Sequence, residues 1–280
     1  MSAPDRVPLN ETAWFGGGPT PASGTESATR VADVLLMFTA TQGWLGVTEL
    51  ATALDLNKAV VHRILRSLES RRLVVSDGAQ GRYALGPAAA AIGARALRDL
   101  DIRQVALPVL RRLQIETDET ATVSALVGLA RVYLDQVVSQ QEIKMTVDVG
   151  RPFSLVLGAS SRAVLAASPP DLRRQAIEAA NMSAEDAAVF ERELDEIARA
   201  GVAHSSGERQ PGAGSVAAAV IGPDGRAIGS ISLCGPVARF DEAAVARYAP
   251  LVRDAAQEIS ARLRAAGPAE MAGAASAAPK

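Results

Sequence analysis

One face of the segment at residues 58–71 carries side chains that can donate hydrogen bonds to a nucleic acid. Its members, at helical spacing, are Lys58, Ala59, His62, Arg63 and Arg66. Lysine and arginine can donate to O6 and N7 of guanine in the major groove of DNA. In an isolated helix, a face of this kind is more often simply solvated. The surrounding elements therefore decide whether it is placed to read bases.

The same segment has an apolar face, and a shorter helix is predicted before it. The apolar residues recur at i, i+3, i+4 and i+7, and they are Val61, Ile64, Leu65 and Leu68. Residues 48–54 form another helical pattern, and the break at 55–57 has the length of the turn in a helix-turn-helix. We expect Thr48 and Asn57 to cap the two helices, because a short side-chain oxygen accepts hydrogen bonds from first-turn N–H groups.

A β-hairpin is predicted directly after the basic helix. Residues 73–75 and 82–85 are short β-like runs around a connection that contains glycine. A further helix is expected before the motif, at residues 27–41. Helix, helix, basic helix and hairpin is the order of a winged helix-turn-helix. In the hairpin, Gln80 and Arg82 are the expected phosphate contacts.

The charge of the chain is distributed unevenly. The formal net charge is −2. Residues 30–100 hold nine Lys and Arg against six Asp and Glu, whereas residues 101–264 hold eighteen against twenty-one. The basic part is the one that contains the helix-turn-helix, which is typical of a nucleic-acid-binding surface confined to one domain.

Composition and length indicate a globular protein with room for two domains. The chain has 280 residues, of which 48% are hydrophobic and 21% charged. Its single cysteine excludes an internal disulfide framework. No apolar stretch reaches the ~18 residues of a membrane span, and the first residues lack the pattern of a secretory signal. We therefore expect a cytoplasmic protein without a membrane partner.

Composition shifts divide the chain into five parts. The first is rich in Pro, Gly, Ser and Thr, which is typical of disorder, and the third is rich in alanine. The predicted parts are a disordered tail at 1–26, a winged helix-turn-helix domain at 27–86, a linker helix at 87–100, a second domain at 101–266 and a flexible tail at 267–280.

The second domain is predicted to be α+β, with an antiparallel sheet of five or six strands and flanking helices. Pro223-Asp224-Gly225 is a strong turn signal between two of the strands. Strands are expected at 120–127, 131–138, Lys144–Val149, 215–221 and 227–234, with an extended segment from 201. Helices are expected at 102–116, 160–167, 171–180, 184–200 and 241–265.

Over about residues 27–265 the chain resembles the IclR-type transcriptional regulators. Three stretches carry the resemblance: the helix-turn-helix from Val47 to Leu68 with its hairpin, the segment from Val149 to Ala166, and the segment from Gly201 to Arg239. The resemblance implies a winged helix-turn-helix, a linker helix and a GAF-like effector domain. We accordingly expect a ligand-responsive regulator, a repressor rather than an activator by our prediction, that binds double-stranded DNA at a palindromic operator as a homo-oligomer, a dimer or a dimer of dimers. We expect no cofactor, and the sequence itself leaves repression or activation open.

In that family a small effector, often a carboxylate or an aromatic acid, lies in a pocket of the second domain. The residues that carry over are Leu155, Ala159, Ser160, Ser205, Ser215, Ser232 and Cys234. The backbone N–H groups of Ala159 and Ser160 precede a short helix, whose N-terminus attracts anions. The chain departs from the family pattern at Ser154, Val156, Ser161-Arg162 and Ser205, where proline, histidine, Gly-Lys and an acidic side chain occur. These departures predict a less charged pocket.

Two other functions are open at this point. An enzyme that uses Cys234 is one, although the sequence provides no identifiable base beside it and no catalytic triad or metal-ligand set. A structural DNA-binding protein whose second domain only oligomerises is the other. His204 has no second histidine or nearby cysteine, so we do not expect it to bind a metal.

Overall fold

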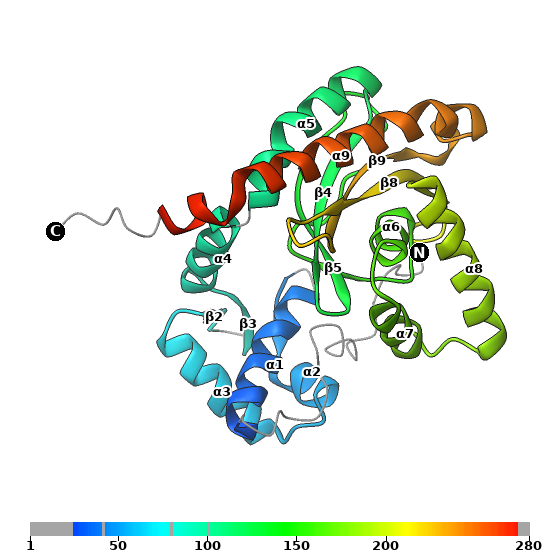
Figure 1. Cartoon of the computed structure of the whole chain (residues 1–280). Coiled ribbons are helices and arrows are strands. Elements are labelled where there is room, and N and C mark those ends of the chain that lie inside the picture. Colours follow the sequence, from blue (N-terminus) through cyan, green and yellow to red (C-terminus); the bar gives the residue numbers. More distant parts are fainter. Residues whose placement is uncertain (1–24, 41–42, 79–80, 100, 274–280) are drawn as a thin grey trace. The chain divides into compact units, whose positions relative to one another are not determined.

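The computed structural model describes residues 25–40, 43–78, 81–99 and 101–273. The chain forms two compact units, residues 1–99 and 100–280. The predicted N-terminal tail falls almost entirely outside the described residues, and so does Gln80. Each unit combines helices with an antiparallel sheet, as predicted (Figure 1).

The first unit is the predicted winged helix-turn-helix. A small antiparallel sheet in the order β1-β3-β2 contains the two strands of the hairpin. The elements are α1 (Glu26–Ala40), β1 (Leu45–Gly46), α2 (Val47–Ala53), α3 (Lys58–Ser70), β2 (Val74–Ser76), β3 (Arg82–Leu85) and α4 (Pro87–Asp99).

The apolar face of α3 forms the centre of the core of this unit. Its residues Val61, Ile64, Leu65 and Leu68 are buried against α1 and α2. Full burial of an aliphatic side chain stabilises a fold by about 1.5–3 kcal/mol. Four such residues fix the rotation of the helix about its axis. The basic face of α3 must therefore point into solvent.

The two predicted helix caps have different outcomes. Asn57 caps α3 as predicted, because its Oδ1 accepts a hydrogen bond from the N–H of Ala59 at 2.8 Å. The cap at Thr48 is wrong, since α2 already begins at Val47. There the N–H of Gly46 donates to the Glu49 carboxylate at 2.7 Å. A negative charge in the first turn also interacts favourably with the helix dipole, so the longer acidic side chain takes the place of a hydroxyl cap.

The second unit is built around a six-stranded antiparallel sheet in the order β6-β5-β4-β9-β8-β7, counted over the described residues. Helices α5 and α9 cover one face, and α6, α7 and α8 lie on the other (Figure 1). The elements are α5 (Asp101–Thr117), β4 (Thr120–Val127), β5 (Ala130–Val137), β6 (Pro152–Ser154), α6 (Ala159–Ala166), α7 (Pro170–Ala179), α8 (Ala184–Ala200), β7 (Ala203–Ser206), β8 (Ala213–Ile221), β9 (Ala227–Pro236), a 3-10 turn η2 (Val237–Arg239) and α9 (Glu242–Gly273).

Two expectations for the second unit are wrong. Lys144–Val149 is not a strand, apart from a single bridge between Val149 and Tyr133. The Gln136 side chain takes the place of a strand partner there: its amide donates to the carbonyl of Val147 and accepts from the N–H of Val147, both at 2.9 Å. In addition, α9 continues to Gly273, past its predicted end at 265.

The sheet face toward α6 is lined with hydroxyl groups. Pairing between β4 and β9 brings Thr122 opposite Ser232 and Ser124 opposite Ser230. The hydroxyl oxygens lie 2.7 and 2.8 Å apart, respectively, and all four side chains are buried. Buried polar groups are stable in a fold only when they are hydrogen-bonded, and here each satisfies the other.

Candidate DNA-binding face and effector pocket

The basic face of α3 is exposed to solvent. Lys58, Ala59, His62, Arg63 and Arg66 all lie on it, opposite the buried apolar residues. Arg66 is 3.9 Å from the carboxylate of Glu69, which is a weak ion pair at an exposed position. The structure thus brings together the helix residues that the sequence singles out. Such a face can approach phosphates and base edges together.

Arg82 has partners within the fold. Its Nη2 donates to the carbonyl of Trp44 at 2.6 Å and lies 3.8 Å from the Glu49 carboxylate. These contacts tie the hairpin to the start of α2. The side chain is still 43% exposed, and its contact with a phosphate stays a prediction. Gln80 lies outside the described residues, and Thr48 is exposed on α2.

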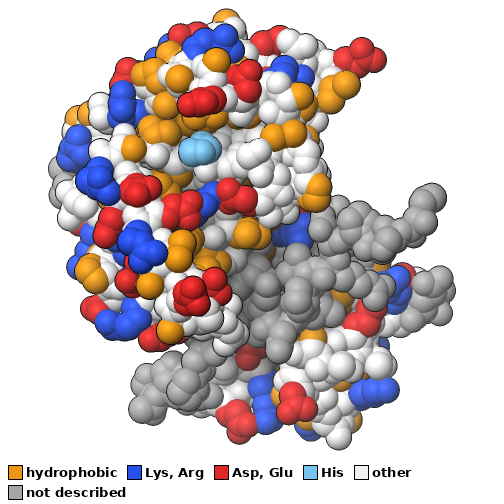
Figure 2. All heavy atoms as spheres, turned by 90° about the vertical axis from the view of Figure 1, so that its right-hand side faces the viewer, with side chains coloured by type: hydrophobic (Ala, Val, Ile, Leu, Met, Phe, Trp, Pro, Cys, Tyr) orange, Lys and Arg blue, Asp and Glu red, His pale blue; other side chains and the backbone are white. Residues whose placement is uncertain are grey.

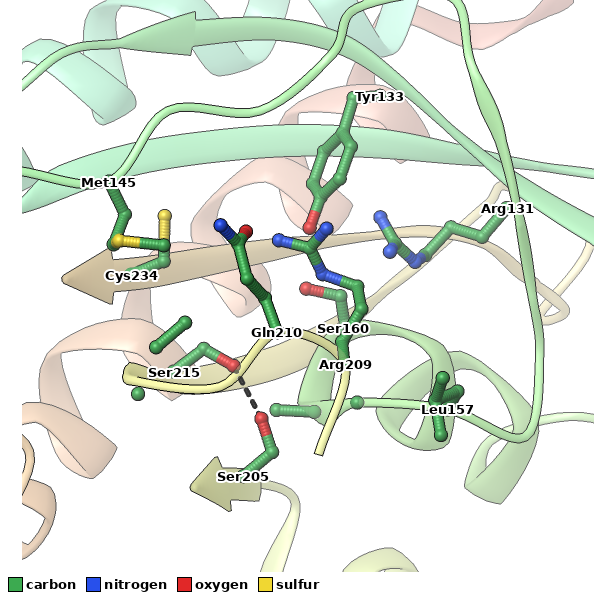
Figure 3. A pocket seen from close by; sticks show the side chains of 14 residues that line it. Arg131, Tyr133, Met145, Leu157, Ser160, Ser205, Arg209, Gln210, Ser215 and Cys234 are labelled. Atoms are coloured by element: carbon green, nitrogen blue, oxygen red, sulfur yellow. Dashed lines mark hydrogen bonds between the residues drawn. The ribbon is translucent and has the colours of Figure 1, made fainter. Parts of the chain in front are cut away.

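A pocket in the second unit contains five of the seven predicted effector residues (Figure 3). It lies between β5, β8, β9, the start of α6 and the connection from β7 to β8. The five that line it are Ala159, Ser160, Ser205, Ser215 and Cys234. They come from segments far apart in the sequence, which the sheet and α6 bring to one place.

The other two predicted residues do not line this pocket. Leu155 is buried in an apolar cluster with Val164, Leu165 and Leu194, and Leu157 lies at the pocket wall instead. Ser232 is buried beneath α6, where its hydroxyl is already hydrogen-bonded to Thr122 at 2.7 Å. Leu155 and Ser232 were predicted from matching sequence positions. Such a match does not determine whether a side chain points into the pocket or away from it.

The start of α6 offers backbone donors to the pocket. Gly158 precedes the helix with φ of 80°, a conformation that suits glycine. The first N–H groups of a helix have no partner within the helix, and here these belong to Ala159 and Ser160. Ser205 and Ser215 add hydroxyls, which lie 2.8 Å from each other. Together these groups favour a ligand with hydrogen-bond acceptors or negative charge.

Two arginines in the pocket were missed by sequence reasoning. Arg131 on β5 and Arg209 from the connection between β7 and β8 both line it. Arg131 is only 1% exposed, and burial lowers its pKa while Tyr133 opposes that effect. The pocket therefore carries two positive charges that the predicted effector residues did not include. The alternation of β5 placed Arg131 and Tyr133 on one face, but alternation does not tell which face is buried.

Arg162, at one of the departures from the family pattern, does not line the pocket. Its guanidinium forms ion pairs with Glu193 on α8 and with Glu208, and it donates to the carbonyl of His204 at 3.2 Å. This arginine therefore fastens α6 to α8 and to the connection that carries Arg209.

Cys234 lies in the pocket as a buried thiol. Burial raises its pKa to about 12, although Arg209 and Arg131 act in the other direction. The thiol is therefore protonated at neutral pH, and a protonated thiol is a poor nucleophile. Within the part of the chain that the structure describes, no group of His, Cys, Asp and Glu side chains is placed to hold a metal ion.

The pocket is nearly filled by its own side chains. Its free volume is about 20 Å³, room for about one water molecule. Figure 3 shows the side chains of Arg209 and Gln210 reaching into it. A second groove of about 240 Å³ lies between α6, α8, β8 and α9, but its lining is mostly alanine and includes none of the seven predicted effector residues.

The surface of the second unit differs from α3 in its charge pattern. Figure 2 shows basic and acidic side chains intermixed over the face that carries α7 and α8. Ion pairs such as Arg173 with Asp195 and Arg174 with Asp171 belong to this surface. Among the described helices, none is long and apolar enough to cross a membrane.

Comparison with known families identifies both units. The family model for the bacterial transcriptional regulator IclR C-terminal domain matches residues 94–261. The model for the IclR helix-turn-helix domain matches residues 27–78. The chain belongs to the IclR family of transcriptional regulators. Its first unit is the DNA-binding domain of that family, and its second unit is the effector domain.

Individual IclR-family relatives agree with this result. The HTH-type transcriptional regulator BhcR of Paracoccus denitrificans is 32% identical over 251 residues, which cover 88% of this chain and 90% of BhcR. A crystal structure of an IclR transcriptional regulator from Alicyclobacillus acidocaldarius is 27% identical with a TM-score of 0.73, covering 85% of this chain and 99% of that one. An IclR homologue from Microbacterium hydrocarbonoxydans, complexed with 4-hydroxybenzoate, shares the fold at 21% identity and a TM-score of 0.67, covering 85% of this chain and 99% of that one.

Proposed function

We propose that this IclR-family regulator is a repressor that releases its operator when a small organic acid enters the pocket of the second unit. The observation that carries the DNA part is the basic face of α3, which the buried apolar face holds toward solvent. The observation that supports the ligand part is the pocket with convergent donors at the start of α6. The repressor acts on DNA, so we place it in the cytoplasm.

The contacts with DNA divide into two groups. Lys58, His62, Arg63 and Arg66 read base edges, because they lie on the exposed face of a helix that fits a major groove. The remaining predicted contacts hold phosphates or position the helix; they are Thr48, Asn57, Ala59, Gln80 and Arg82. A homo-oligomer, a dimer or a dimer of dimers, presents two such helices to a palindrome with half-sites about one helical turn apart.

Ligand binding acts on DNA binding through a difference in affinity. An effector shifts the regulator only as far as it binds the DNA-competent and the DNA-incompetent arrangements with different affinity. The residues proposed to contact it are the five that line the pocket: Ala159, Ser160, Ser205, Ser215 and Cys234.

The DNA-binding proposal is tested on fragments that the protein itself selects from genomic DNA. Fluorescence anisotropy then compares the wild type with the Arg63→Ala/Arg66→Ala variant. Loss of one arginine that is bidentate to guanine costs about 1–3 kcal/mol, so we expect at least ~30-fold weaker binding. The matched control is Arg174→Ala/Arg226→Ala, which removes the same charge from side chains that are 61% and 75% exposed in the second unit. Undiminished affinity in the first variant overturns the assignment.

A structural DNA-binding protein whose second unit only oligomerises is the alternative. The pocket argues for a ligand-binding role instead, because it has the features of small-molecule sites, which are concave and have a few convergent polar groups. A ligand that binds only the folded state raises its melting temperature. A screen of small acids in which no compound shifts the melting temperature supports the structural role instead. We propose no catalytic role for Cys234, since its thiol stays protonated.

A further inference from the structure

We propose that the pocket of the second unit binds a compact dianionic acid, and that Arg131 and Arg209 are the two cations that neutralise it. This inference rests on the proposed effector function and adds the chemical class of the ligand. It depends on three features of the pocket. One cation is buried without an anionic partner, a second cation lies against the same aromatic ring, and nearby carboxylates form ion pairs with other arginines.

Arg131 is a buried guanidinium whose charge is not balanced by the groups packed against it. Its Nε donates to the hydroxyl of Ser161 at 3.0 Å, whereas its buried Nη1 has no hydrogen-bond partner. The guanidinium carbon lies 4.1 Å from the ring centre of Tyr133 and 5.4 Å from that of Phe153. Arg209 and Cys234 are the other groups that act on its charge. Buried charges in proteins are normally paired, so this one is arranged for a ligand.

Arg209 lies against the same aromatic ring as Arg131. Its guanidinium carbon is 5.1 Å from the ring centre of Phe153. Figure 3 shows the Arg131 guanidinium pointing toward that of Arg209. Two cations at short range repel each other, and accordingly Arg209 contributes to the lowered pKa of Arg131. An anion between them removes that repulsion and gains charge-assisted hydrogen bonds from both.

Acidic side chains near the pocket already have basic partners: Asp148, for example, lies 3.3 Å from Arg151, whose guanidinium is over the same Phe153 ring at 5.4 Å. Glu208, next to Arg209 in the chain, forms an ion pair with Arg162. Glu119, which acts on the charge of Cys234, forms two hydrogen bonds with Arg239. The residues that line the pocket include the two arginines but neither Asp nor Glu. The lining therefore has two positive charges, which a dianion balances and a monoanion does not.

The size and position of the donors limit the ligand further. The free volume is about 20 Å³ with the side chains of Arg209 and Gln210 in place, so a ligand enters only as these side chains move aside. The segment that carries them lies between Gly207 and Gly212, which have φ of 74° and 83°. One carboxylate then meets Arg131 and Arg209, and the other meets the start of α6 at Ser160. A dicarboxylate of about two to four carbons is roughly as large as the space that these two side chains vacate. It can therefore reach the two arginines with one carboxylate and the start of α6 with the other.

The test compares dicarboxylates with monoacids of the same length on the full-length protein. Isothermal calorimetry and thermal unfolding are recorded with oxalate, malonate and succinate, and with glycolate, propionate and butyrate as controls. Inorganic phosphate is included as a probe for a single dianionic group. We expect at least one dicarboxylate to bind about tenfold or more tightly than its matched monoacid. If monoacids bind as tightly, or if no dicarboxylate binds, the inference is wrong.

Two variants assign the effect to the arginines. Arg131→Met and Arg209→Met should each weaken binding of the dicarboxylate about tenfold to a hundredfold, because each removes charge-assisted hydrogen bonds, while Arg226→Met on an exposed turn leaves it unchanged. The ligand-free melting temperature of Arg131→Met should equal or exceed that of the wild type, since binding residues are often placed at the expense of stability. A purely structural arginine predicts a lower melting temperature and unchanged affinity. Arg209→Met, at a partly exposed position, keeps the test valid if Arg131→Met does not fold.

Failure of this inference and failure of the proposed function give different results. Binding of the ligand-free protein to its selected DNA depends on α3 and not on the two pocket arginines. If only the ligand class is wrong, Arg131→Met and Arg209→Met bind the acids as the wild type does, and all three proteins still bind DNA. If the DNA-binding part of the proposed function is wrong, the wild type selects no DNA fragment; if only its ligand part is wrong, the wild type selects DNA but none of the acids shifts its melting temperature.

Discussion

Removal of Arg239 should destabilise the second unit by leaving a buried carboxylate unpaired. Glu119 is 2% exposed, and Arg239 reaches it with Nε at 2.5 Å from Oε1 and Nη2 at 2.9 Å from Oε2. This pair holds η2 against the start of β4, beside the pocket strand β9. The hydrogen bond with Glu119 raises the pKa of Arg239, so the arginine is charged throughout the accessible pH range.

The size of the effect follows from the exposure of the two partners. Removing one member of a buried ion pair costs about 3–5 kcal/mol. The Arg239 side chain is 34% exposed, so water reaches the vacated position, and we expect the lower end for Arg239→Leu, about 3 kcal/mol. In a domain of about 150–250 residues each kcal/mol shifts the melting temperature by roughly 2–4 °C. The expected loss is therefore about 6–12 °C.

Urea unfolding at pH 5 and pH 7.5 tests the reasoning. A buried carboxylate without a cation takes up a proton more readily in the folded than in the unfolded state. The destabilisation of Arg239→Leu should therefore shrink as the pH falls. In the Glu119→Gln/Arg239→Leu variant this pH dependence should disappear. A loss below about 1 kcal/mol that is the same at both pH values would refute the account of this pair.

Three further predictions concern the cap of α3, the thiol and the buried hydroxyls. Asn57→Ala removes the hydrogen bond to Ala59 and should destabilise the first unit by about 1 kcal/mol, measured by circular dichroism in urea; an unchanged midpoint would contradict the cap. Because burial raises the pKa of Cys234 to about 12, iodoacetamide at pH 8 should modify it only after unfolding, and rapid modification of the folded protein would show a thiolate. Thr122→Val leaves the Ser232 hydroxyl without its partner at 2.7 Å and should cost about 1–3 kcal/mol, whereas adding Ser232→Ala should cost less than the sum of the single changes.

The DNA-binding unit was predictable because its information is local. The apolar spacing of α3, the short break before it and the glycine-containing hairpin after it each depend on a few consecutive residues. The exception is the start of α2, where Glu49 rather than Thr48 satisfies the first N–H. Helix propensity and spacing do not show which of two polar side chains reaches the backbone.

The pocket was predictable only in part because its information is not local. The resemblance led to Ala159, Ser160, Ser205, Ser215 and Cys234, whose positions were carried over from the family pattern. It did not lead to Arg131 and Arg209, since two segments must fold against one aromatic ring before their charges meet. The prediction of a strand at Lys144–Val149 was wrong for the same reason. The side chain that forms hydrogen bonds with this segment belongs to Gln136, which lies on another strand.

The central claim is that a ligand in the pocket of the second unit changes the affinity of α3 for DNA. The most direct measurement is the dissociation constant for the selected operator, with and without a saturating dicarboxylate, for the wild type and for Arg131→Met. Allosteric coupling of about 1–3 kcal/mol corresponds to a change of roughly 5- to 150-fold. We predict such a weakening for the wild type and a clearly smaller one for Arg131→Met at the same dicarboxylate concentration, while the ligand-free affinity of the variant should equal that of the wild type. An operator affinity that stays constant while calorimetry shows the pocket to be occupied would contradict the account.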